Sequence, residues 1–155
     1  MPLHLPKPPA VLRGPVQCLS GEALVLVLNR SLRKLIDDGE LDFLVGRCVA
    51  IGVDDVGLSW RLTMRDQRMR VSSDPPDVTI AGKVADLLLM ASRREDPDTL
   101  FFQRRLRIEG DTELGLWVKN LMDRLELEDL PAPVRMAVTM AGAMVSGADR
   151  AADPV

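Results

Sequence analysis

VTIAGKVADLLL, residues 78–89, is the stretch in which the chain changes from strand to helix. Val78 and Ile80 alternate with less apolar residues, which is typical of a half-buried strand. Gly82 ends this pattern, and apolar residues then recur at the spacing of a helix as far as residue 94. The stretch predicts a strand followed directly by a helix, and therefore a fold that mixes the two.

Alternating patterns also precede this stretch. Residues 49–53 and 58–64 alternate between apolar and other side chains, and residues 54–57 have the composition of a hairpin turn. A third short strand is expected near residues 69–72. Together with residues 78–82 they predict a four-stranded antiparallel meander with one apolar and one polar face.

A fifth strand and further helices follow from the same reasoning. Phe102, Leu106 and Ile108 alternate and predict a strand that Gly110 closes. Asp111 or Thr112 is expected to cap a helix that carries Trp117 and Leu121, and residues 133–146 predict a last helix. On the N-terminal side, Ser20 is expected to begin an amphipathic helix that ends near Asp38.

The length of 155 residues fits one domain. Residues 1–15 contain five prolines, so we expect a flexible tail there and a single domain over residues 16–150. The apolar run at residues 23–28 is too short for a signal peptide or a membrane span, which predicts a cytoplasmic protein.

The composition excludes several classes of function. Hydrophobic residues make up 46% and charged residues 28%, with a net charge of −3 and only 3% aromatic residues, so no nucleic-acid partner is expected. The only histidine is His4, in the proline-rich segment, while Cys18 and Cys48 belong to no metal-binding motif. We expect two buried, reduced cysteines, no metal, no cofactor and no enzymatic activity.

The last predicted helix is the most unusual local feature. It carries no charge between Met136 and residue 148, and Met136, Met140 and Met144 recur every four residues. One interpretation is an ordinary buried helix. The other is a deformable apolar wall or lid, because methionine adapts to irregular apolar ligands.

Arg104 also allows two interpretations. On the predicted fifth strand it shares the face of Phe102 and Leu106. Its side chain either reaches water from the strand end or is placed to bind an anionic head group.

Two segments resemble the sterol carrier protein 2 (SCP2) family: residues 78–89 and FFQRRLRIEGD, residues 101–111. In that family a strand ending in Gly leads into a helix, and a second strand ending in Gly-Asp leads into the next helix. The resemblance covers about residues 41–125. Residues 100–121, LFFQRRLRIEGDTELGLWVKNL, more narrowly resemble the UbiT-type ubiquinone biosynthesis accessory factors. The arginine-rich fifth strand departs from the general family pattern and favours this narrower group.

The resemblance implies an SCP2-like α+β fold in which a five-stranded, mainly antiparallel sheet and its helices enclose an apolar tunnel. It implies a non-enzymatic accessory factor for oxygen-independent ubiquinone biosynthesis, which binds polyprenylated quinone precursors or membrane lipids. The expected partners are lipid, ubiquinone biosynthesis proteins and, transiently, the membrane surface. A general phospholipid or fatty-acyl carrier and a protein-interaction scaffold without a lipid ligand are the alternatives.

The residues expected to line the tunnel lie at alternating or helically spaced apolar positions. They are Leu58, Trp60, Leu62, Val78, Ile80, Leu88, Phe102, Leu106, Trp117, Leu121, Met136, Met140 and Met144, with Arg104 as the head-group candidate.

Overall fold

A five-stranded sheet with the strand order β3-β2-β1-β4-β5 forms the centre of the molecule. The structure is a computed structural model that describes residues 10–152, with side-chain surroundings for residues 21–147. The strands are β1 (Val49–Val53), β2 (Leu58–Arg65), β3 (Arg68–Val71), β4 (Val78–Gly82) and β5 (Leu106–Gly110). The predicted α+β class and the mainly antiparallel five-stranded sheet are confirmed.

The order of the strands corrects the predicted meander. Strands β1, β2 and β3 do form an antiparallel meander, but β4 returns to pair with β1, and this pair is parallel. Two bonds fix the return: the Asp77 amide donates to the Cys48 carbonyl (2.8 Å), and the Cys48 amide donates to Asp77 Oδ2 (2.8 Å). Alternation reports which residues share a face, and it carries no information about which strand lies next to which.

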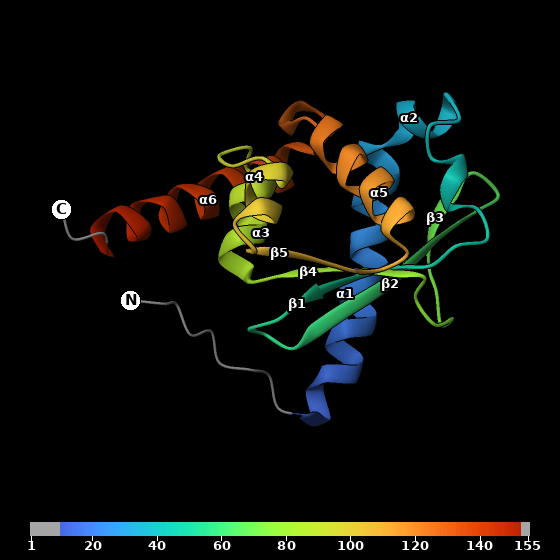
Figure 1. Ribbon diagram of the computed structural model, residues 1–155, viewed down its shortest axis with the longest axis horizontal. Coiled ribbons are helices and arrows are strands. Elements are labelled where there is room, and N and C mark those ends of the chain that lie inside the picture. The colour runs from blue at the N-terminus through green and yellow to red at the C-terminus, as the bar shows by residue number, and fades with distance from the viewer. Residues whose placement is uncertain (1–9, 153–155) are drawn as a thin grey trace.

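Six helices surround the sheet in the described part of the chain. They are α1 (Ala10–Ser31), α2 (Arg33–Asp37), α3 (Val84–Ala91), α4 (Pro97–Phe102), α5 (Thr112–Arg124) and α6 (Ala132–Ala152), with short 3₁₀ turns η1 (Asp42–Leu44) and η2 (Leu127–Asp129). Figure 1 shows α2 to α5 on one side of the sheet, α1 running steeply past it, and α6 extending outward.

The first helix begins earlier than the sequence predicts. It starts at Ala10 rather than at Ser20, and the chain bends between α1 and α2 near Leu32. Residues 10–15 of the predicted tail are therefore helical, while residues 1–9, His4 among them, lie outside the described residues. The prediction rested on the number of prolines, but four of the five precede Ala10.

The start of the fifth strand is also corrected. Phe102 is the last residue of α4, and β5 begins only at Leu106. The Asp96 carboxylate caps α4 by accepting the Thr99 amide at 2.6 Å, and Pro97 occupies the first turn. A short capped helix therefore occupies the segment that simple alternation extends into the strand.

The main core lies between one face of the sheet and helices α1 and α5. Val49 and Ile51 of β1 stand opposite Leu62 and Trp60 of β2 on this face. Gly115 lets α5 come close, because a Cβ there would lie 2.5 Å from Ile108 Cγ2 and 3.2 Å from Val78 Cγ2. This close approach sets the position of the helix face that forms the cavity described below.

Candidate functional site

An apolar cavity of about 80 Å³ lies between α1, α5 and the apolar face of the sheet. Every residue that lines it is apolar. The lining residues are Leu28, Leu32, Leu44, Val49, Ile51, Leu62, Met69, Val118, Leu121, Met122 and Leu125. A space with no polar wall can hold an aliphatic group and offers nothing to bind a polar one.

Among the described side chains of helix α1, Asn29 hydrogen-bonds to the edge strand β3. Asn29 Nδ2 donates to the Met69 carbonyl (3.1 Å), and the Met69 amide donates to Asn29 Oδ1 (2.7 Å). The Asn29 amide group therefore pairs with Met69 as a neighbouring strand would. This wall of the cavity is held by two partly buried hydrogen bonds.

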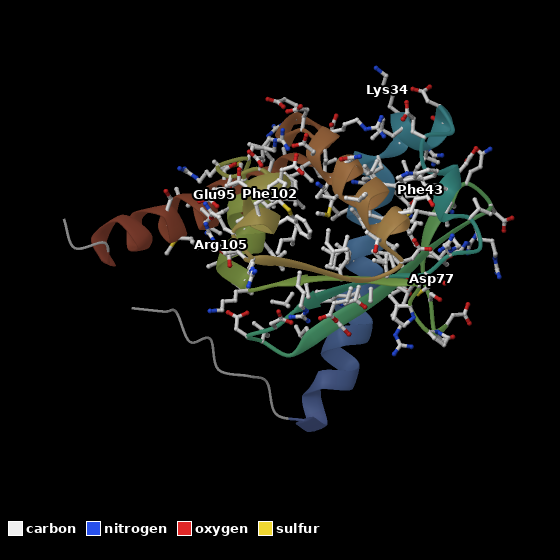
Figure 2. The ribbon with its side chains drawn as sticks, in the orientation of Figure 1. Lys34, Phe43, Asp77, Glu95, Phe102 and Arg105 are labelled. Carbon is white, nitrogen blue, oxygen red and sulfur yellow. The ribbon has the colours of Figure 1, made fainter. Side chains whose placement is uncertain are left out.

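The contacts between α5 and the segment that follows α2 are weaker. Arg124 Nη1 donates to Glu40 Oε2 at 2.5 Å, and both side chains are exposed. Beside this ion pair, the Phe43 and Trp117 rings meet edge to face at 5.3 Å between centroids; Figure 2 shows Phe43 next to α5. These two contacts join α5 to the segment that follows α2, and Phe43 and Arg124 each directly precede a residue that lines the cavity.

The predicted lining residues are distributed over several regions. Leu62 and Leu121 line the apolar cavity, while Val78, Ile80 and Leu106 are buried in the adjoining core. Leu58, Trp60 and Leu88 are half-buried outside the cavity. The residues that the sequence analysis missed come mostly from α1, β1 and the last turns of α5. The helical spacing of Leu28 and Leu32 would have revealed their shared face.

Five of the predicted lining residues are exposed instead. Phe102 is 78% exposed and Trp117 48%, because each lies on the outer side of its helix. Met136, Met140 and Met144 are 63%, 64% and 75% exposed. The structure thus corrects the interpretation of α6 as an ordinary buried helix, and the methionine stripe does not line the cavity in this arrangement.

Helix α6 packs on α3 through its other face. Gly142 lies so close to Ser92 that a Cβ at this position would overlap the Ser92 hydroxyl. The outer face consists of the three methionines with small or uncharged neighbours, as far as Gly147. Within the described residues no helix, α6 included, combines the length and apolarity that crossing a bilayer requires.

A second hollow, the α4–β5 groove, lies at the opposite edge of the sheet from β3 and has a volume of about 680 Å³. Its lining mixes charged and aromatic residues. They are Asp54, Ala81, Gly82, Lys83, Asp86, Phe101, Phe102, Arg104, Arg105, Leu106, Arg107 and Ile108. Arg104, the head-group candidate, lies here in the turn between α4 and β5 and not on a strand.

The titratable groups with shifted pKa values have structural roles. The Leu114 amide and Arg47 lower the pKa of Asp111, which caps α5 and is one of the two residues predicted for that role. Burial raises the pKa of the Cys48 thiol, which is free, whereas the Cys18 side chain lies outside the described residues. Nowhere in the described chain do three histidine, cysteine or acidic side chains gather to hold a metal ion.

Comparisons with known proteins agree on one family. Residues 27–123 match the SCP-2 sterol transfer family. The ubiquinone biosynthesis accessory factor UbiT of Escherichia coli, in strains K12 and O157:H7, is 48% identical over 133 residues, which cover 83% of this chain and 76% of UbiT. The solved structure of the UbiJ-SCP2 ubiquinone synthesis protein matches with a TM-score of 0.56 and 19% identity, over 68% of this chain and 89% of that one. At this identity the structural match shows a shared fold.

Proposed function

Because this chain belongs to the SCP-2 sterol transfer family, we propose that it binds lipid in the apolar cavity between α1, α5 and the sheet. The identity to UbiT supports a role as an accessory factor in ubiquinone biosynthesis. On this proposal the cargo is a polyprenylated quinone precursor, the pathway is the oxygen-independent one, and the protein performs no chemistry on its cargo.

The observation that carries the proposal is the uniformly apolar lining of the cavity. Each methylene group that leaves water contributes about 0.8 kcal/mol, so a prenyl tail gains most from a wall without polar atoms. An enzyme working in water can reach such a substrate only if another molecule shields the tail. A small protein with an apolar cavity supplies that shield.

The cavity must widen to accept a tail. An apolar cavity of about 150 Å³ holds one benzene molecule, and the present volume is about 80 Å³. The contacts between α5 and the segment that follows α2 are cheap to break: an exposed ion pair such as Arg124–Glu40 contributes about 1 kcal/mol or less, and an aromatic pair such as Phe43–Trp117 about 0.5–1.5 kcal/mol. We infer that cargo enters there, with Met69 and Met122 adapting to it.

Two tryptophan substitutions, one at the C-cap of α5 and one within the helix, test this site. Leu125→Trp adds bulk to the cavity, whereas Leu116→Trp adds the same group on the exposed side of the helix. We expect a quinone with a two-unit prenyl tail to raise the melting temperature of the wild type and of Leu116→Trp, and to raise that of Leu125→Trp much less. Equal shifts in all three proteins would refute binding in the cavity.

The methionines on the outer face of α6 support a proposal about delivery. We infer that this uncharged face rests on the membrane surface while the tail passes between bilayer and protein. Methionine side chains suit such contact because they adapt to a fluid, irregular apolar surface.

A further inference from the structure

The α4–β5 groove contains an apolar platform. The rings of Phe101 and Phe102 meet edge to face with 5.8 Å between their centroids, and Phe102 is largely exposed. Figure 2 shows Phe102 at the end of α4, on the same side of the molecule as Glu95 and Arg105. An exposed phenylalanine beside an open groove offers contact area to the stem of an organic ligand.

The charges in the groove are unbalanced. Its lining includes four cations and two carboxylates, although the chain as a whole has a net charge of −3. Both carboxylates are already engaged: Asp86 bonds to Arg105 at 2.6 Å, and Asp54 to Arg107 at 2.9 Å. Arg105 also donates to Glu95 at 2.8 Å.

Two cations in the groove are left without an acidic partner. Among the described residues, no carboxylate bonds to Lys83 or Arg104. Lys83 precedes the first turn of α3, and Arg104 follows α4, so they approach the groove from two different helices. An oxyanion between them would be bound by charge-assisted hydrogen bonds, and the fork of Arg104 suits two of its oxygens.

The backbone at Arg104 gives an independent reason to expect a role for its side chain. Arg104 has φ +60°, its amide donates to the Phe101 carbonyl (3.0 Å), and the Arg105 amide donates to the Leu100 carbonyl (2.8 Å). This is a Schellman end, in which glycine is preferred because a Cβ is strained at positive φ. An arginine here lowers stability relative to glycine.

Helix α3 provides an internal comparison, because it ends in the same way. Arg93 has φ +61°, and its amide donates to the Met90 carbonyl at 3.1 Å. Its guanidinium lies 3.8 Å from Asp123 and does not line the groove. The two arginines thus share one backbone setting, and Arg104 alone of the pair lines the α4–β5 groove.

We propose that the α4–β5 groove binds an oxyanion, phosphate or carboxylate, that is carried on an apolar stem. Lys83 and Arg104 hold the oxyanion, and Phe101 and Phe102 contact the stem. No residue of this groove lines the apolar cavity, so the site is separate from the proposed cargo site. It would let the protein recognise an anionic amphiphile independently of the lipid tail in the cavity.

The test uses octyl phosphate, below its aggregation concentration, and calorimetry on the full chain. We expect Arg104→Gly to weaken binding at least tenfold while the melting temperature stays equal or rises. Arg93→Gly should have the same effect on the melting temperature and leave the affinity unchanged. Lys83→Gln should weaken binding like Arg104→Gly. Arg104→Asn, a residue that tolerates the same backbone, provides a second variant if the glycine protein does not fold.

Further ligands separate the sources of affinity. Octanol should bind at least tenfold more weakly than octyl phosphate, and inorganic phosphate should also bind at least tenfold more weakly. Equal affinity for inorganic phosphate would overturn the role of the stem, and equal affinity for octanol would overturn the role of the cations. If Leu125→Trp abolishes octyl phosphate binding while Arg104→Gly does not, the ligand occupies the apolar cavity, and the groove proposal is wrong.

Discussion

Asn29 shows how much of the fold can depend on one polar side chain. It interrupts an apolar helix face, yet its amide pairs with both backbone groups of Met69 on the edge strand β3. Truncating it removes two partly buried hydrogen bonds, and each such bond contributes about 0.5–1.5 kcal/mol net. The side chain therefore satisfies the strand edge and fixes the cavity wall at once.

We expect Asn29→Ala to lower the free energy of unfolding by about 1–3 kcal/mol, as measured by urea denaturation. The free energy of unfolding of Asn29→Asp should fall between those of the wild type and Asn29→Ala. A carboxylate still accepts from the Met69 amide but cannot donate to the Met69 carbonyl. An alanine variant as stable as the wild type would show that the pairing contributes nothing.

The sequence predicts the roles of single residues only where those roles are local. The capping role of Asp111 could be predicted because a cap acts within one turn of its own residue. The pairing of Asn29 with Met69 joins residues forty positions apart, and no local pattern reports it. Lys119 is similar: it is buried on α5, bonds to Asp98 of α4 and lies over the Phe101 ring at 5.5 Å.

At the scale of elements, α6 depends on its glycines in two different ways. A Cβ at Gly142 would overlap Ser92 on α3, whereas a Cβ at Gly147 would meet nothing within 4 Å. Alanine is favoured over glycine inside a helix by about 1 kcal/mol at either position. At Gly142 the overlap with Ser92 costs about 1–3 kcal/mol, which outweighs this gain. At Gly147 there is no overlap, so the gain remains.

We expect Gly142→Ala to destabilise the docking of α6, seen as faster proteolysis within α6 and a lower melting temperature. Gly147→Ala should have the opposite effect and raise helix stability by up to about 1 kcal/mol. The idea that α6 docks on α3 through Gly142 fails if both variants change stability in the same direction.

The elements themselves were largely predictable, and their ends less so. Strands near residues 49–53, 58–64 and 78–82 follow from alternation, because each has one face on the core. The start of α1 depends on where the chain becomes helical after the prolines that precede Ala10. The end of α4 depends on the Schellman turn at Arg104. Alternation misplaced Phe102 because its hydrophobicity fits both a strand and an exposed helix end.

At the scale of the whole molecule, α6 presents an exposed methionine face that no other described element covers. Met140 and Met144 are more than half exposed, so replacing them should change the free energy of unfolding by no more than about 0.5 kcal/mol. We expect Met140→Gln with Met144→Gln to reduce co-sedimentation with phospholipid vesicles several-fold while the melting temperature stays within about 1 °C.

Leu116→Gln, which removes an exposed apolar side chain from α5, is the matched control and should leave vesicle binding unchanged. Undiminished co-sedimentation of the methionine variant would contradict membrane contact through α6. The sequence identified the methionine stripe but not the direction it faces, because that depends on which side of α6 meets α3.

The parallel pairing of β1 with β4 joins two parts of the chain: an early part, up to β3, and a late part, from β4 onward in the sequence. Strands β1 to β3 pair with near neighbours in sequence, while α5, which closes the apolar cavity, belongs to the late part beyond β4. Contacts distant in sequence form slowly, and a chain leaves the ribosome N-terminus first. The cavity is therefore absent from the growing chain until α5 has emerged and the two parts have joined.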